Sequence, residues 1–444
     1  MVVALCASVS SAATTDDTQR ARVSPEAPAP GDATARQPVP PVTVASSAAR
    51  QVLDRVRPAI IQIKGFFGTN TSEAFHGTGF AAARGGIFVT NWHVVSDAVL
   101  YPEKYRLEYK TSVGTTGRLN VHAIDVRHDL AIVEAVGFAP APLELWPEAK
   151  KGEHAYSIGF PLDVGLTITE GVNNGRVEDS FEPRIHYSGA LNAGMSGGPG
   201  LDATGRVIGV NVAVNFQSQL VAFFVPAEYA IALLSSSTGK PLDAKRVNEE
   251  IADQLRAHSE ALLAALDTPL PSQNDQGYEL PAKPAGFFVC GAAGDPAPDQ
   301  PIQIERFYCD ANATLYVASD IRSGGLWFRH SILHSTTLDA WRFAHRLQAI
   351  STLSSGKIGS GRNRQLAPYA CKQNDLALDG LQVSAIVCLR AYRRFEGLYD
   401  LNVHIVSKNE ARRAFVSTLS LTGVSSEAAL AFAKTYLAAI GWKP

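Results

Sequence analysis

One serine in this chain has the neighbours that a catalytic nucleophile needs. Ser196 lies in the stretch Gly194-Met-Ser-Gly-Gly-Pro199, just before a strand-like run at residues 206–214. Glycines on both sides of a serine allow backbone conformations that other residues avoid, so that successive N–H groups can point to one place beside the hydroxyl. Such donors stabilise the negative charge that develops during acyl transfer. Because a serine hydroxyl is a weak nucleophile without a base, the stretch also predicts a histidine and an acid elsewhere in the chain.

Both partners occur upstream of the serine. His93 follows a β-type run in Thr90-Asn-Trp-His, and its near-neutral pKa suits it to take a proton from a hydroxyl and return it to a leaving group. Asp129 opens an apolar strand, where a carboxylate is partly buried and can hold an imidazole in one tautomer. Asp97 and Asp125 are rivals for this place. We expect Asp97 on the same short helix as His93 and Asp125 in solvent.

The elements that must position these residues are short strands. Runs of β-type residues, separated by glycine, proline and asparagine, occupy most of the chain between residues 59 and 226. Many short strands with frequent turns are typical of an all-β barrel or sandwich. A short helix is expected from Ser46 until Pro58 ends it. Residues 46–240 are therefore predicted to form one β domain that contains all three candidate catalytic residues.

The order His93, Asp129, Ser196 is that of chymotrypsin-like proteases and differs from the subtilisin and α/β-hydrolase orders. Residues 48–236 resemble trypsin-like serine proteases of the HtrA/Deg class. The resemblance rests on six blocks: Val56-Arg-Pro-Ala-Ile-Ile61, Gly77-Thr-Gly-Phe80, Thr90-Asn-Trp-His-Val-Val95, Asp129-Leu-Ala-Ile-Val133, Ala190-Leu-Asn-Ala-Gly-Met-Ser-Gly-Gly-Pro199 and Ala222-Phe-Phe-Val-Pro226. It implies two six-stranded β-barrels with the triad in the cleft between them, and an enzyme that needs no metal or cofactor.

The resemblance also assigns the residues around the nucleophile. The oxyanion hole maps to the backbone N–H groups of Gly194 and Ser196, with Met195 between them. The pocket floor of trypsin-like enzymes lies six positions before the nucleophile, so the substrate pocket is assigned to Ala190, Asn211 and Val212. Without a carboxylate at this floor, we expect cleavage after small or medium-sized apolar residues rather than after Arg or Lys. Two residues depart from the family pattern: Met195 replaces the usual Asn, and Gly200 replaces the usual Leu.

The C-terminal half differs from the N-terminal half in its sequence pattern, and it has no recognisable PDZ signature. An apolar stripe at helical spacing predicts one helix over residues 243–266, packed on the outer wall of the second barrel, with His258 as a core histidine. Residues 267–284 are interpreted as a linker, which places the helix and linker at 241–285. Residues 286–444 are expected to be a smaller α+β region built as a two-fold repeat, each copy ending in a helix. In an exported protein, its four cysteines predict two disulfides, each within its own copy: Cys290–Cys309 and Cys371–Cys388.

The N-terminal residues indicate where the protein is located in the cell, and the net charge limits the partners that we expect. Residues 1–13 resemble the apolar core and cleavage site of a signal peptide whose start is expected upstream, and residues 14–45 are predicted to be a disordered tether. The net charge of −2 gives no general reason to expect nucleic acid as a partner. A basic cluster around Arg390 is interpreted as a solvated face, and His330 and His334 receive no role. The apolar runs are too short to span a bilayer.

The sequence thus predicts a periplasmic or secreted serine endopeptidase that acts on protein or peptide substrates through an acyl-enzyme, and it leaves open whether the protein is a homo-oligomer. The alternative is a pseudo-protease or binding protein that acts through the C-terminal repeats, and an esterase with the same triad is a third reading. Because the C-terminal half carries none of the triad, we expect it to recruit substrates or gate access, and to remain movable relative to the cleft.

Overall fold

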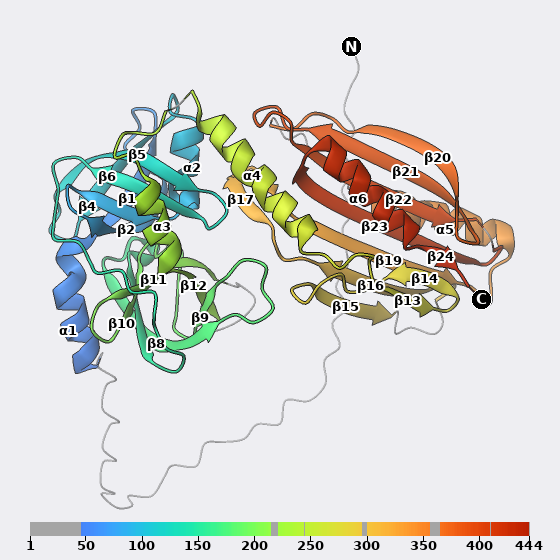
Figure 1. The fold of residues 1–444 in the computed structure, drawn as a ribbon, viewed down its shortest axis with the longest axis horizontal. Coiled ribbons are helices and arrows are strands. Elements are labelled where there is room, and N and C mark those ends of the chain that lie inside the picture. The colour runs from blue at the N-terminus through green and yellow to red at the C-terminus, as the bar shows by residue number, and fades with distance from the viewer. Residues whose placement is uncertain are drawn as a thin grey trace, which may run out of the picture. The chain divides into compact units, whose positions relative to one another are not determined.

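The computed structural model of the chain describes residues 46–214, 221–243, 245–294, 300–355, 365–408 and 410–443. The expected signal peptide and the expected tether lie outside these ranges. Within them, two closed six-stranded barrels are followed by a C-terminal region of strands and helices (Figure 1). The expected fold class, mainly β with a double barrel and an α+β C-terminal region, is confirmed.

The first barrel closes through the strand order β1-β2-β3-β6-β5-β4. Its strands are β1 (Ile60–Phe67), β2 (Glu73–Ala83), β3 (Ile87–Thr90), β4 (Tyr105–Thr111), β5 (Thr116–Asp125) and β6 (Leu130–Ala135). Helix α1 (Ser47–Val56) precedes the barrel and begins where the Ser46 hydroxyl accepts a hydrogen bond from the Ala49 N–H at 3.0 Å. Helix α2 (Trp92–Leu100) connects β3 to β4, and His93 is its second residue.

The second barrel closes through the order β10-β11-β12-β9-β8-β7. Its strands are β7 (His154–Gly159), β8 (Thr167–Arg176), β9 (Ile185–Tyr187), β10 (Pro199–Asp202), β11 (Val207–Val214) and β12 (Ala222–Pro226). Helix α3 (Ala227–Ser236) follows its last strand. Ser196 lies in the turn just before β10, so the candidate nucleophile belongs to the second barrel and the candidate base, His93, to the first.

Helix α4 (Val247–Ala264) carries the predicted apolar stripe but packs against the first barrel, not against the second as the sequence predicts. The apolar residues shared with the first-barrel core are Val247, Ile251, Ala252 and Leu255. The Gln254 side chain fixes this position, because it accepts from the Val126 N–H at 2.7 Å and donates to the Ile124 carbonyl at 3.0 Å. Both backbone groups lie where β5 ends.

A buried carboxylate adds polar contacts between α4 and the barrels. Glu182, in the segment before β9, is 6% exposed. It accepts from Arg127 Nε at 2.7 Å and lies 3.2 Å from His258 Nδ1 on α4. Burial alone would raise the pKa of Glu182, but His258 and Arg127 outweigh it and the pKa is lowered. His258 is thus a buried histidine that joins α4 to the barrels.

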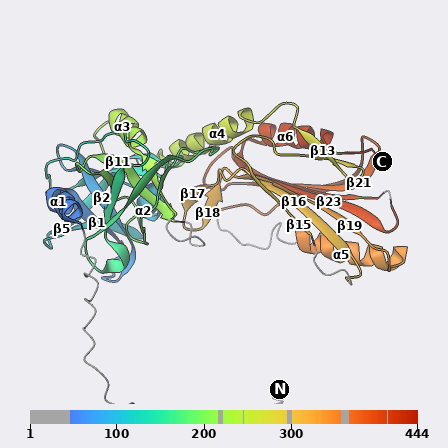
Figure 2. The same cartoon turned by 90° about the horizontal axis from the view of Figure 1, so that it is seen from below.

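The C-terminal region is built on one antiparallel sheet with the strand order β15-β16-β19-β23-β22-β21-β20. Its strands are β15 (Val289–Gly294), β16 (Gln303–Asp310), β19 (Leu326–His334), β20 (Ala370–Leu378), β21 (Leu381–Ala391), β22 (Tyr399–Ser407) and β23 (Arg413–Val424). Helices α5 (Ala340–Ser355) and α6 (Ser426–Ala438) lie on opposite faces of this sheet (Figure 2). The alternation of β23 explains this, because Phe415 packs with the α6 core and Val416 packs with the α5 core.

The predicted repeat takes the form of two disulfide-bonded hairpins at the two edges of one sheet. Cys290 pairs with Cys309 across β15 and β16, and Cys371 pairs with Cys388 across β20 and β21. Each pair lies directly opposite in the strand register. The two copies are not separate modules, because their inner strands join into a single sheet with three strands from the first copy and four from the second.

The segment predicted to be a linker is folded. Residues 272–281 form β13 (Ser272–Asp275) and β14 (Tyr278–Pro281), and β14 pairs with β24 (Gly441–Trp442). Tyr278 is 1% exposed and stacks on Phe415, so a large aromatic residue buried against the main sheet anchors this hairpin. Among the helices of the described ranges, none has the length and apolar character to cross a membrane.

Candidate active site

His93 is held by Asp129 at two points. The first N–H groups of a helix have no partner within the helix, and the His93 N–H donates to Asp129 Oδ1 at 2.9 Å. His93 Nδ1 lies 2.7 Å from Asp129 Oδ2. Asn91, just before the helix, donates its side-chain amide to the Asp129 carbonyl at 2.8 Å. One residue therefore fixes both the start of α2 and the orientation of the imidazole.

Asp129 occupies this place in an unusual backbone conformation, with a φ of 60°. Residues other than glycine seldom adopt a positive φ, and such strain is concentrated at functional sites. Burial alone would lower the pKa of His93, but the charge and the hydrogen bond of Asp129 outweigh it, so the pKa of His93 is raised above its ordinary value. The carboxylate thus stabilises the protonated imidazole, as a general base requires.

The two rival acids have other partners. Asp97 lies on α2, as expected, and accepts a hydrogen bond from the Ser319 hydroxyl at 3.1 Å. Asp125 is not the solvated acid that the sequence suggests, because its Oδ2 lies 2.7 Å from His128 Nδ1. In the described part of the chain, neither acid is hydrogen-bonded to His93.

The loop of Ser196 is tied to the first barrel by its backbone. The Thr78 N–H donates to the Ser196 carbonyl at 2.8 Å, and the Thr78 hydroxyl donates to the Gly194 carbonyl at 2.7 Å. Gly197 has a φ of +83° and packs against the residues before His93, where a Cβ would lie 2.9 Å from the Asn91 nitrogen. Only glycine fits this close approach. The loop therefore lies next to the segment that leads into His93, although no hydrogen bond of the described residues joins the Ser196 hydroxyl to the imidazole.

The two departures from the family pattern have packing explanations. Met195 is fully buried in the core of the second barrel, in a cluster that includes Tyr187 and Phe224. An apolar side chain at this position therefore anchors the loop by packing. Gly200 faces the Phe224 ring, and a Cβ there would lie 2.7 Å from Phe224 Cδ2. The aromatic ring thus fills the space that a larger residue at position 200 would need.

The residues assigned to the oxyanion hole differ in how their N–H groups are used. The Met195 N–H donates to the Asn192 carbonyl at 3.0 Å. Among the hydrogen bonds of the described residues, none uses the N–H of Gly194 or of Ser196. These two amides are therefore the donors left for a ligand.

The three residues assigned to the substrate pocket differ in their exposure to solvent. Ala190 is exposed beside the loop, and Val212 is 8% exposed. Asn211 is fully buried, and its amide donates to the carbonyls of Ile158 and Met195, each at 3.1 Å. The Asn211 side chain therefore braces the nucleophile loop instead of lining a pocket.

Two residues beside this site are absent from the sequence-based assignment. His76 lies against Gly194, where a Cβ would be 2.7 Å from the imidazole Cδ2, and its buried Nε2 has no hydrogen-bond partner in the described part of the chain. Its place directly before the Gly77-Thr-Gly-Phe80 block is a signal that could have found it. Tyr316 packs edge-on against His93, with ring centroids 5.8 Å apart, and no local signal connects two residues so far apart in sequence.

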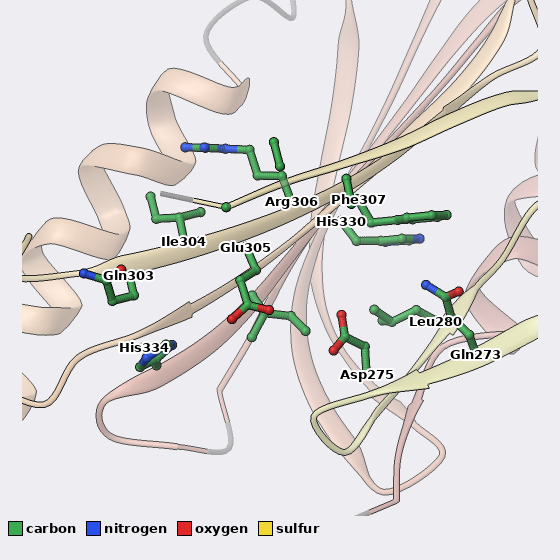
Figure 3. Close-up of a pocket in the computed structure, with 14 residues that line it drawn as sticks. Gln273, Asp275, Leu280, Gln303, Ile304, Glu305, Arg306, Phe307, His330 and His334 are labelled. Carbon is green, nitrogen blue, oxygen red and sulfur yellow. The ribbon is translucent and has the colours of Figure 1, made fainter. Parts of the chain in front are cut away.

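A groove of about 640 Å³ lies away from these residues, in the C-terminal region. Figure 3 shows Asp275 and Glu305 reaching into it from different strands. Burial and the charge of Glu305 both raise the pKa of Asp275. His330 and His334, which receive no role from the sequence, also line this groove. No group of three or more His, Cys, Asp or Glu side chains in the described ranges is arranged to hold a metal ion.

Comparison with known proteins agrees with the barrels. Residues 77–210 match the family described as a trypsin-like peptidase domain. The chain is 29% identical to "Serine protease HTRA3" of Homo sapiens over 176 residues, covering 36% of this chain and 39% of that protein. It is 30% identical to "Probable periplasmic serine endoprotease DegP-like" of Bartonella henselae over 197 residues, covering 40% and 38%. Rattus norvegicus HTRA3 is 26% identical over 255 residues, covering 54% and 53%.

The chain thus spans about two fifths to one half of the length of these relatives. The matched residues include His93, Asp129 and Ser196. Taken with the two closed barrels, these comparisons show that residues 77–210 resemble a trypsin-like peptidase domain and that the chain is similar over this part to HtrA and DegP-like serine proteases.

Proposed function

We propose that the protein is a serine endopeptidase that hydrolyses protein substrates through an acyl-enzyme, with Ser196 as nucleophile, His93 as general base and Asp129 as its partner. The observation that carries this proposal is the two-point attachment of His93 to Asp129. A hydrogen bond from Nδ1–H to the carboxylate leaves Nε2 as the acceptor in the neutral imidazole. The contacts of Thr78 and Gly197 with the nucleophile loop support Ser196 as the group that Nε2 serves.

The reaction proceeds in two halves. The Ser196 hydroxyl transfers its proton to His93 Nε2 while its oxygen attacks the scissile carbonyl carbon, and the oxyanion accepts hydrogen bonds from the Gly194 and Ser196 N–H groups. The protonated His93 then donates to the departing amine as the C–N bond breaks. A water molecule repeats these steps on the ester and releases the acid. Asp129 stabilises the imidazolium in both halves.

The substrate and location are part of the same proposal. Ala190 at the pocket floor favours small or medium-sized apolar residues before the scissile bond. The two disulfides, and the similarity to a protein named as periplasmic, support a periplasmic or secreted location.

A fluorescent fluorophosphonate probe tests the nucleophile. The wild-type protein should be labelled at Ser196 and should cleave unfolded casein, and mass spectrometry should place the cleavages after apolar residues. The Ser196→Ala variant should lose labelling and about a millionfold in turnover, by the scale of nucleophile removal in a triad. Ser235→Ala, which removes an exposed hydroxyl from α3, is the matched control and should be labelled normally.

Other outcomes would favour the alternatives. A folded protein that binds unfolded casein but is neither labelled nor active would be a pseudo-protease. Labelling with cleavage of esters but not of casein would indicate an esterase. Cleavages that cluster after Arg or Lys would contradict the assigned pocket.

A further inference from the structure

A hairpin from the C-terminal region lies against the helix that carries the catalytic histidine. Strands β17 (Leu315–Ala318) and β18 (Ile321–Ser323) pair only with each other, and their apolar residues belong to the core of the first barrel. The fully buried Trp92 donates its indole N–H to the Val317 carbonyl at 3.1 Å. Ser319, at the tip of the hairpin, donates to Asp97. The hairpin is therefore docked along α2 by both apolar packing and hydrogen bonds.

Two side chains of this hairpin lie beside His93. The Tyr316 ring meets the imidazole edge-on, with centroids 5.8 Å apart and an interplanar angle of 65°, and its side chain is hydrogen-bonded to Ser96 on α2. The Arg322 guanidinium lies over the Tyr316 ring, with its central carbon 4.1 Å from the ring centroid. Tyr316 therefore contacts both Arg322 and His93.

In the part of the chain that the structure describes, Arg322 is a cation without an acidic partner. One guanidinium nitrogen donates to the carbonyls of Ala318 at 2.9 Å and Ile321 at 3.3 Å, which holds the side chain in place. The residue is exposed. Within the described residues, no carboxylate forms an ion pair with it. The fixed position and the accessible charge are what a carboxylate-binding group needs.

The charge of Arg322 opposes the step that His93 must perform. The charged or titratable groups that face His93 are Asp129, Tyr316 and Arg322, while Asp97 acts on Tyr316 and Arg184 on Asp129. Asp129 favours the imidazolium, whereas the nearby cation disfavours it. A substrate carboxylate placed on Arg322 would remove this opposition, most strongly in the transition state, when His93 is protonated.

We propose that the β17–β18 hairpin completes the active site and that Arg322 binds an acidic side chain, Asp or Glu, of the substrate close to the scissile bond. Tyr316 acts as a positioning residue, because it supports both Arg322 and the His93 ring. The inference rests on the proposed endopeptidase function. It assigns a specificity-determining residue to the C-terminal region.

The test uses pairs of fluorogenic peptides that differ only by Glu or Gln, with the acid placed in turn at each of the three positions on either side of the scissile bond. All peptides are C-terminally amidated, and one further set keeps the free C-terminal carboxylate. At one position the wild-type enzyme should prefer Glu by about threefold to fivefold in kcat/KM, the range of one exposed ion pair, with part of the gain in kcat. A preference only for the free C-terminus would replace the acidic side chain by a terminal carboxylate and overturn the assignment.

Three variants separate charge from structure. Arg322→Gln should abolish the Glu preference, Arg322→Lys should keep most of it, and Arg306→Gln, which removes an exposed arginine from β16, should leave it unchanged. With neutral peptides, Arg322→Gln should move the acidic limb of the kcat/KM profile to higher pH, because the pKa of His93 rises when the cation is removed. A merely structural role for Arg322 would not move this limb in a defined direction.

Fluorophosphonate labelling of every variant distinguishes the two proposals. If the folded wild-type protein is not labelled at Ser196 and cleaves nothing, the endopeptidase proposal fails, and this inference fails with it. If the wild-type protein is labelled and active but treats Glu and Gln peptides alike, only this inference is overturned. The same holds if Arg322→Gln leaves both the preference and the pH profile unchanged.

Discussion

Two histidines, one in the barrels and one in the C-terminal sheet, show how opposite properties arise from the same side chain. His93 lies at the start of a helix, partly accessible, and a carboxylate raises its pKa. His330 is 1% exposed within the sheet, where its hydrogen-bond partners among the described residues are the Ser417 hydroxyl and the Pro281 carbonyl, and burial lowers its pKa to about 3. The protonated form is therefore favoured at His93 and disfavoured at His330. The partner and the access, rather than the residue type, decide which histidine can do chemistry.

The two regions also differ in how they hold their strands. In the barrels every strand has a neighbour on each side. The C-terminal sheet is open, and at each of its two edges a disulfide joins the two outermost strands. The barrels thus hold their strands by closure, whereas the sheet has a covalent bond between the two strands at each edge.

The largest expected effect concerns the acids beside two histidines of the barrels, His93 and His128. Asp129→Asn should keep the fold but lower kcat on unfolded casein by about ten-thousandfold, the scale for losing the acid of a triad. Asp125→Asn is the matched control, because Asp125 Oδ2 lies at the same 2.7 Å distance from a histidine Nδ1, that of His128. It should retain activity within a few-fold.

Equal losses in the two variants would contradict this view of the site. That result would mean that each carboxylate acts only by holding its turn together, and that a catalytic histidine cannot be recognised from its pairing. Circular dichroism of both variants controls for unfolding.

The features that could be predicted from the sequence are those that depend on residues close together in the chain. The Gly194–Pro199 stretch and the Asp129 block carry local signals that a sequence can show: glycines that adopt a positive φ, and an acid directly before a buried strand. The same local logic gives both cysteine pairs, since each joins adjacent strands of one hairpin.

The rest depends on contacts between distant segments. The apolar residues of α4 do not indicate whether the helix packs on the first barrel or on the second. The hydrogen bonds of the Gln254 side chain with the backbone at the end of β5 fix the helix on the first barrel. The expectation of a movable C-terminal half fails for a related reason, because Trp92 and the β17–β18 hairpin share one core with the first barrel. A chain that ends near Asp267 would expose that tryptophan, so we expect such a fragment to cleave peptides less well than the full chain.

Removal of either disulfide should have an effect of intermediate size, on stability rather than on activity. Replacing Cys290 and Cys309 together by serine, or Cys371 and Cys388 together, should lower the free energy of unfolding by about 3 kcal/mol in either case, because the closed loops of 19 and 17 residues are nearly equal. Urea unfolding measures this change. Under native conditions both variants should hydrolyse a short peptide as the wild-type protein does. Parallel loss of peptide cleavage would show instead that the sheet edges and the cleft form one cooperative unit.

The smallest effect uses pH to compare the two histidines directly. His330 has a lowered pKa, so below the ordinary value of 6.5 the unfolded chain binds a proton that the folded chain refuses, and stability is lost as the pH falls from about 6.5 towards 3. His93 has a raised pKa, so its contribution is present below 6.5 and is lost as the pH rises. His330→Gln should therefore flatten the loss of stability between pH 6.5 and 5 by up to about 1.4 kcal/mol per pH unit, measured by urea unfolding. Burial and the charge of Arg329 lower the pKa of His404 to about 4. The variant His404→Gln should therefore also flatten the loss of stability at low pH. If both variants keep the wild-type slope, the two buried histidines do not oppose protonation, and the contrast with His93 is wrong.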